Sequence, residues 1–199
     1  PNGGTQSLIN YYIMAEAKYV SALRFRWLTP LYDFFVGVTM PERRIKQTLI
    51  NASFLTDYAA VLDFGCGTGT LTIMAKEHRP SINITGIDID PQAIKASQEN
   101  ALRNHCDPAR FIFTTTHKVA ERDLQPEEQM DIVVANILAN PLIILAPILA
   151  AAVRKQGHIV LSGILKEQAE EVRNIYQQWF DMRIAEEQEG WVLLTGIKR

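Results

Sequence analysis

Residues 61–69 read Val-Leu-Asp-Phe-Gly-Cys-Gly-Thr-Gly, and this stretch decides the fold of the 199-residue chain. A mostly apolar run leads directly into three alternating glycines, and an amphipathic segment follows. Glycine lacks a Cβ atom, so it adopts backbone conformations that other residues avoid and lets a ligand approach the main chain closely. The pattern predicts a strand, a ligand-binding turn formed by Gly65, Gly67 and Gly69, and a helix.

The rest of the chain from residue 60 onward alternates short β-branched runs with amphipathic segments. This alternation is typical of the βα units of a parallel sheet and predicts an α/β fold with a doubly wound sheet. The last two strands have only residues 187–190 between them and should be antiparallel neighbours. The predicted strands are residues 60–64, 82–88, 110–113, 131–135, 159–162, 182–186 and 191–196.

Helix starts are marked where a capping side chain precedes a proline, at Asp90-Pro91 and at Asn140-Pro141. The apolar stretch 137–153 falls short of the ~20 residues that span a bilayer, so we expect a buried helix and no membrane span. Residues 1–58 have helical patterns interrupted by proline and glycine. This pattern predicts an N-terminal helical cap or lid. We expect residues 59–199 to form the ligand-binding domain.

Composition limits the function classes. Twenty Lys and Arg against 22 Asp and Glu give a net charge of -2, which does not favour a nucleic-acid partner. Cys66 and Cys106 form no C-x-x-C pair, which fits a reducing, cytoplasmic setting. The four histidines show no metal-binding spacing, so no metal is expected. The oligomeric state stays open.

A second motif lies at the end of the second predicted strand, where Gly86-Ile87-Asp88 places a carboxylate. In doubly wound folds, an acid at this position accepts hydrogen bonds from both ribose hydroxyls. An ordinary tight turn and a solvated strand end are the alternatives, but the two motifs together favour nucleoside binding. Asp90 is expected to act only as the helix cap.

These two motifs, VLDFGCGTG at 61–69 and GIDIDPQA at 86–93, resemble those of class I S-adenosylmethionine-dependent methyltransferases. That family has a Rossmann-like sheet of seven strands with the last antiparallel, and it needs no metal. The resemblance implies a turn around the methionine part of the cofactor, a carboxylate on its ribose and an apolar side chain beside its adenine. The residues implied are Asp63, Gly65, Cys66, Gly67 and Gly69 for the turn, Asp88 for the ribose and Ile89 for the adenine. Thr114, Thr115 and Thr116 follow the third predicted strand, where relatives often hold the adenine amine with an acid or amide.

A narrower resemblance covers residues 84–199. The segments DIVVANILANPL (131–142), HIVLSGILKEQAEEV (158–172) and GWVLLTGIKR (190–199) are similar to methyltransferases of the large-subunit ribosomal protein eleven. By contrast, residues 25–50 resemble the leader of small-molecule methyltransferases of the ubiquinone and menaquinone type. A recombined chain and a divergent natural one both fit. The quinone-type resemblance implies that Tyr32 covers the cofactor, although a packing role fits equally well.

Asn136 is the candidate catalytic residue, because it closes the fourth predicted strand beside the first, at the topological switch point. Its side-chain carbonyl can accept an N–H bond and align an amine for methyl transfer, unless it only satisfies local backbone. The sequence favours methyl transfer to nitrogen on a protein lysine or an amine. A quinone-like or lipid acceptor and a cofactor-binding scaffold without catalysis are the alternatives.

Overall fold

The computed structural model describes residues 42–115 and 129–199. Its helices and strands alternate along the chain, as the apolar pattern predicts. The elements are α3 (Glu42–Ala52), β1 (Ala60–Phe64), α4 (Thr70–His78), β2 (Asn83–Asp88), α5 (Pro91–Arg103), β3 (Ile112–Thr115), β4 (Met130–Asn136), α7 (Ala139–Ala152), β5 (Val153–Leu165), α8 (Ala169–Tyr176), β6 (Phe180–Gln188) and β7 (Trp191–Lys198).

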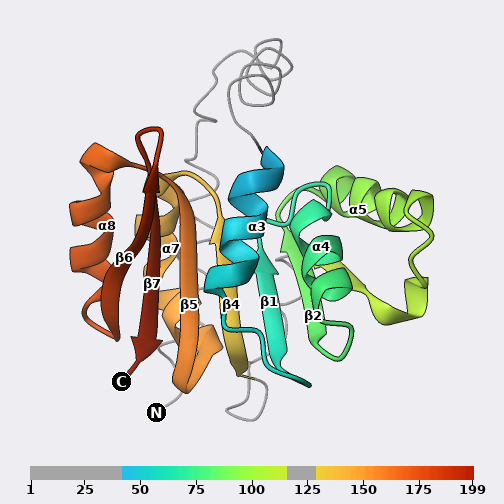
Figure 1. Ribbon diagram of the computed structural model, residues 1–199, viewed down its shortest axis with the longest axis horizontal. Coiled ribbons are helices and arrows are strands. Elements are labelled where there is room, and N and C mark those ends of the chain that lie inside the picture. The colour runs from blue at the N-terminus through green and yellow to red at the C-terminus, as the bar shows by residue number, and fades with distance from the viewer. Residues whose placement is uncertain (1–41, 116–128) are drawn as a thin grey trace. The chain divides into compact units, whose positions relative to one another are not determined.

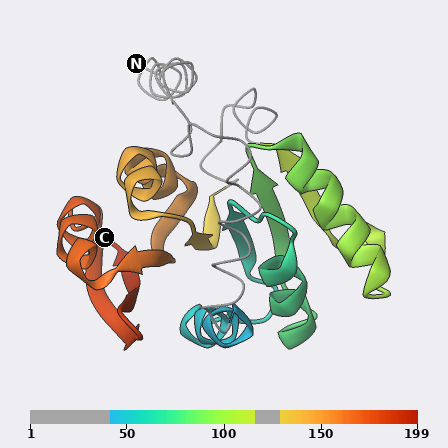
Figure 2. The same cartoon turned by 90° about the horizontal axis from the view of Figure 1, so that it is seen from above.

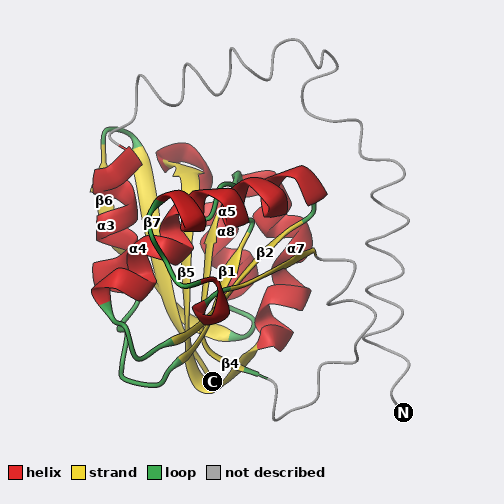
Figure 3. Cartoon of the chain, turned by 90° about the vertical axis from the view of Figure 1, so that its right-hand side faces the viewer, coloured by secondary structure: helices red, strands yellow, loops and turns green. Residues whose placement is uncertain are grey.

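The described strands form one seven-stranded sheet in the order β3-β2-β1-β4-β5-β7-β6 (Figures 1 and 3). β1 pairs in parallel with β2 and β4, β2 with β3, and β4 with β5. β7 is antiparallel to both of its neighbours, β5 and β6. The predicted doubly wound sheet with its last strand antiparallel is therefore confirmed.

Helices cover both faces of this sheet. Figure 2 shows α7 and α8 on one side and α4 on the other. Tyr176 of α8 is fully buried, and its hydroxyl donates to the carbonyl of Leu142 in α7 at 2.8 Å, so these two helices are tied together. Ala169 and Val172 are buried with it, so one face of this helix packs inward.

The start of α5 is as predicted, because Asp90 is its N-cap and accepts from the backbone N–H of Gln92 at 2.8 Å. The predicted start of α7 is wrong. That helix begins at Ala139 with Leu138 as its N-cap, so Asn140 lies inside the first turn. The first backbone N–H groups of a helix have no partner within it, so the ring of Pro141 is tolerated there without a preceding side-chain cap.

Among the described strands only β1 has its predicted bounds, and β3 and β5 are two of those that differ. β3 begins at Ile112 and includes Thr114 and Thr115, which were expected to follow the strand. β5 begins at Val153, directly after α7, rather than at residue 159. Its first residues, 154–156, are polar and exposed, so they give no apolar signal.

The chain divides into two compact units, Pro1–Thr48 and Leu49–Arg199. Residues 1–41 of the expected helical cap, which include Tyr32, lie outside the described residues, so the N-terminal cap or lid stays a prediction. Across the described ranges, no helix combines the length and the apolar character needed to cross a membrane.

Candidate functional site

The candidate site lies at the carboxyl edge of β1, β2 and β4. Phe64, the last residue of β1, pairs with Ile87 of β2 and with Ala135 of β4. The residue that follows each of these three in the sequence therefore lies at the same level of this edge. These three residues are Gly65, Asp88 and Asn136, which were predicted from separate motifs and are brought to one edge by the strand register.

The glycine turn, residues 65–69, follows β1. Gly65, Gly67 and Gly69 have φ angles of 73°, 55° and 71°, a region that side chains with a Cβ rarely adopt. A Cβ at Gly65 would lie 2.5 Å from Cγ2 of Ile137, and one at Gly69 would lie 3.0 Å from the ring of Phe113. A Cβ at Gly67 would meet no atom of residues 42–115 or 129–199 within 4 Å, apart from those of its neighbours in sequence. The turn is therefore packed at its two ends and open at its centre, where a ligand has room.

Asp88 links this turn to β2. One oxygen of its carboxylate accepts from the backbone N–H of Gly67 at 2.9 Å, and the other accepts from that of Asp90 at 3.0 Å. A carboxylate has about four acceptor positions, so about two remain for a ligand. That number matches the two hydroxyls of a ribose. Ile89 follows with 47% of its surface exposed, as an apolar contact for a planar ring.

Asp63 lies one residue before the end of β1 and is only 2% exposed. Its carboxylate accepts from the hydroxyl of Thr72 at 2.5 Å and so joins β1 to α4. This bond gives Asp63 a supporting position beneath the glycine turn. Its direct contact with a cofactor stays a prediction.

Two side chains of α5 hold the carbonyl groups of the glycine turn. The hydroxyl of Ser97 donates to the carbonyl of Gly67 at 2.7 Å, and the amide of Asn100 donates to that of Thr68 at 3.1 Å. Ser97 is fully buried. Sequence reasoning missed both residues, although their spacing of three places them on one face of a helix that starts just after Asp88.

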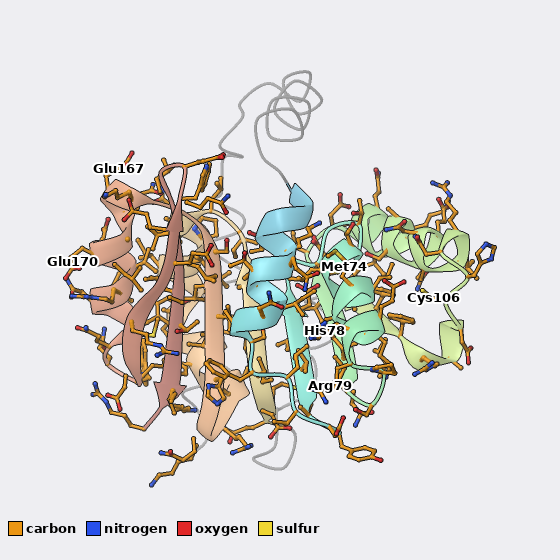
Figure 4. The ribbon with its side chains drawn as sticks, in the orientation of Figure 1. Met74, His78, Arg79, Cys106, Glu167 and Glu170 are labelled. Carbon is orange, nitrogen blue, oxygen red and sulfur yellow. The ribbon has the colours of Figure 1, made fainter. Side chains whose placement is uncertain are left out.

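Cys66 lies in the glycine turn with its sulfur 3.8 Å from the hydroxyl of Ser97. Burial, together with the negative charges of Asp63 and Asp88, raises the pKa of its thiol to about 12. The thiol is therefore neutral near pH 7 and unsuited to act as a nucleophile. Cys106 lies beyond the end of α5 (Figure 4), and both cysteines are free.

Asn136, the last residue of β4, begins the Asn136 loop, residues 136–138. It is half-buried and pairs with Ser162 of β5. Its side-chain amide forms no hydrogen bond with residues 42–115 or 129–199. Within these ranges the amide does not satisfy local backbone, which was the alternative to a functional role.

Gly163 of β5 lies against this loop, and sequence reasoning missed it. Its φ angle is 82°, and a Cβ there would lie 2.4 Å from the carbonyl oxygen of Ile137. The pairing of β5 with β7 shifts register between Leu161 and Ile164, so the strand is irregular where it meets the loop. The signal available in sequence was a lone glycine within a strand pattern, which indicates a bulge or a close backbone approach.

Comparisons with known proteins identify the family of the chain. The family model described as ribosomal protein L11 methyltransferase matches residues 48–199. The chain is 50% identical over 174 residues to a ribosomal protein L11 methyltransferase of Nitrosomonas europaea, covering 86% of this chain and 55% of the relative. It is 49% identical over 184 residues to one of Neisseria meningitidis serogroup A, covering 92% and 58%. The chain thus spans a little over half the length of these relatives.

Solved structures share the fold. A ribosomal protein L11 methylase from Lactobacillus delbrueckii subsp. bulgaricus superposes with a TM-score of 0.67 at 24% identity, covering 79% of each chain. An RNA methyltransferase from Salinibacter ruber, solved with S-adenosyl-L-homocysteine, has a TM-score of 0.61 at 18% identity, covering 78% of this chain and 90% of that one.

The extent of the sequence match also concerns the possibility that the chain combines segments of two different relatives. A match over 92% of the chain must include at least part of residues 25–50, which resemble quinone-type enzymes. The family model, however, matches only residues 48–199, so a recombined chain and a divergent natural one both stay predictions for the residues before it.

Proposed function

Because the chain belongs to the ribosomal protein L11 methyltransferase family, we propose that it transfers a methyl group from S-adenosylmethionine to a nitrogen of a protein acceptor. A lysine or amine of a ribosomal protein is the acceptor class that the named relatives suggest. The observation on which this proposal rests is the half-buried Asn136 amide, level with Gly65 and Asp88 and without a hydrogen-bond partner in the described chain.

The residues at the site fit this cofactor. Asp88 keeps about two acceptor positions for the ribose hydroxyls, and Gly67 leaves open space at the centre of the glycine turn. Ile89 offers an exposed apolar surface for the adenine. When bound, S-adenosylmethionine supplies a methyl group on a positively charged sulfur, which is activated toward a nucleophile.

The task of the Asn136 loop is to present a neutral amine. Removing the proton from a lysine of pKa about 10.4 costs about 4–5 kcal/mol at pH 7. The Asn136 carbonyl can accept an N–H bond from the neutral amine, whereas a carboxylate at this position would stabilise the protonated form. Only the neutral form has a lone pair to donate, and holding it in line with the methyl group contributes through orientation.

Substitution of Asn136 by alanine tests this proposal. We expect Asn136→Ala to reduce methyl transfer from labelled cofactor to ribosomal large-subunit protein eleven by about 100-fold, because the acceptor loses its alignment. Cofactor affinity, measured by calorimetry, should change by less than about twofold, since the interaction concerns the acceptor. Asn140→Ala is the matched control, because Asn140 is an exposed asparagine on α7.

Full turnover by Asn136→Ala, or transfer only to oxygen or carbon acceptors, contradicts the proposal. Transfer to a quinone-like substrate instead of a protein supports the small-molecule alternative, which the resemblance of residues 25–50 favours. Cofactor binding without methyl transfer to any candidate acceptor supports the alternative of a cofactor-binding scaffold without catalysis.

A further inference from the structure

We propose that Ile137 is a positioning residue that fixes the spacing between the glycine turn and the Asn136 loop. This inference rests on the proposed function, because that function assigns the cofactor to the turn and the acceptor to the loop. Ile137 contacts both sides of the site: its side chain lies over Gly65 and its backbone lies against Gly163.

The contact with Gly65 involves one branch of the side chain. A Cβ built on Gly65 would lie 2.5 Å from Cγ2 of Ile137 and 4.0 Å from its Cβ, and apart from the residues adjacent in sequence no other described residue lies within 4 Å. The absence of a side chain at Gly65 therefore makes room for that one methyl group. Isoleucine is stiff at χ1 because it branches at Cβ, so the methyl group has a defined position relative to the backbone.

The contact with Gly163 involves the backbone of Ile137. A Cβ on Gly163 would lie 2.4, 2.8 and 3.3 Å from the O, C and N atoms of Ile137. These are main-chain atoms, which cannot rotate away as a side chain can. Ile137 is thus confined between the end of β5 and the turn after β1.

This confinement links the two halves of the site. Asn136 immediately precedes Ile137, so a displacement of Ile137 moves the Asn136 amide relative to the glycine turn. Ile137 is half-buried, whereas the neighbouring Ala135 is fully buried in β4. The exposure of Ile137 indicates that its contribution lies in the contact geometry more than in core volume.

The first test needs no ligand and follows the side-chain amide signal of Asn136 by NMR in the full chain. We expect Gly65→Ala to move this signal, because the new Cβ must displace Cγ2 of Ile137. Gly67→Ala is the matched control, since it imposes a Cβ at a similar positive φ but in open space. In an Ile137→Ala background, where Cγ2 is absent, Gly65→Ala should leave the Asn136 signal unmoved.

The proposal is overturned if Gly65→Ala leaves the Asn136 signal in place, or if it moves that signal equally when residue 137 is alanine. Each variant needs an unchanged set of core signals, such as those of Val133 and Leu161, to show that it is folded. These two residues are fully buried in β4 and β5.

The second test separates positioning from packing through two substitutions at one site. Ile137→Val keeps both branches at Cβ, and we expect its turnover to stay within about twofold of the parent. Ile137→Leu keeps the side-chain volume but loses the branch over Gly65. We expect it to lower turnover by about 10- to 100-fold, with the affinity for S-adenosylhomocysteine within about threefold.

A packing role gives the opposite order, because leucine conserves volume and valine does not. Turnover that falls more in Ile137→Val than in Ile137→Leu therefore overturns the inference. Failure of the parent chain to transfer methyl groups at all contradicts the proposed function, and the NMR experiment then decides the role of Ile137 independently.

Discussion

The glycine turn and the Asn136 loop follow neighbouring strands at the same edge of the sheet, yet they are held by different forces. The turn is fixed by hydrogen bonds: Asp88 accepts one from it, and Ser97 and Asn100 each donate one to it. The Asn136 loop is confined by steric contact with Gly65 and Gly163. Its polar side chain has no hydrogen bond within the described residues.

The two kinds of contact fit the different roles proposed for the glycine turn and the Asn136 loop. A cofactor-binding turn benefits from saturated backbone groups, because fixed N–H and carbonyl groups need no reorganisation when the ligand binds. An aligning amide needs the reverse, since a hydrogen bond made within the chain would compete with the acceptor. Packing fixes the position of Asn136 while leaving its hydrogen-bonding groups available.

We expect the strongest change from a substitution that removes hydrogen bonds of the glycine turn. Asp88→Ala removes the acceptor for Gly67 and, under the proposed function, for two ribose hydroxyls. Hydrogen bonds to charged groups contribute roughly 1.5–3 kcal/mol each, so we expect calorimetry to show cofactor affinity lowered by more than about 100-fold.

Asp90→Ala serves as the control for this change, because its carboxylate caps α5. We expect it to lower the free energy of unfolding by about 1 kcal/mol while retaining the cofactor. Equal loss of affinity in both variants would show that the effect comes from α5 and not from the ribose contact.

A substitution on the packing side should have the next largest effect. In Gly163→Ala, the new Cβ must push the Ile137 backbone back by about 1 Å to reach ordinary contact, and a misplacement of that size lowers turnover by up to about 100-fold. Cofactor affinity should change little, since the hydrogen bonds of the turn stay in place. Steady-state kinetics combined with calorimetry measures the two quantities separately.

Gly190→Ala is matched to this variant in backbone conformation. Gly190 has the same φ of 82°, but a Cβ there meets no atom within 4 Å in the part of the chain that the structure describes, apart from those of the residues next to it in sequence. Both variants carry a similar strain of about 1–3 kcal/mol in the free energy of unfolding. A similar loss of turnover in both would mean that backbone strain, rather than contact with Ile137, is responsible.

We expect the weakest change from the loss of a single neutral hydrogen bond to the glycine turn. Ser97→Ala removes one neutral hydrogen bond to the turn, so we expect calorimetry to show cofactor affinity lowered by about 2- to 12-fold. Ser53→Ala is the control, because its hydroxyl is also buried and also donates to a backbone carbonyl, that of Leu49. Loss of stability without loss of affinity in Ser97→Ala would remove this serine from the support of the turn.

The sequence was informative where a single residue type has few roles. The glycine turn follows β1 and Asp88 ends β2, and the alternation of strands with helices predicts the sheet to which both strands belong. The turn and Asp88 meet at one edge because these strands are parallel. The cap Asp90 was correct for the same reason, since its side chain bonds locally. Asn136 was predicted at the end of β4, and its side chain is free to act within the described residues.

The features that sequence reasoning missed depend on contacts between distant segments. Ser97 is an ordinary helical serine until the fold brings it to the carbonyl of Gly67, 30 residues away. Gly163 gains its significance only from Ile137, which lies on another strand's loop. The predicted start of α7 was wrong because Asn140-Pro141 has the pattern of a capping residue followed by proline. The observed helix begins earlier and has no side-chain cap.

The position of β7 has a consequence for how the molecule is made. β7 follows β6 in the sequence but lies between β5 and β6 in the sheet, and among the described strands β6 pairs only with β7. A chain emerging from the ribosome therefore presents β6 before the strand that joins it to the sheet exists. Until β7 emerges, β5 keeps an unpaired edge, and unpaired strand edges are prone to aggregation. Completion of the sheet thus waits for the last strand to be synthesised.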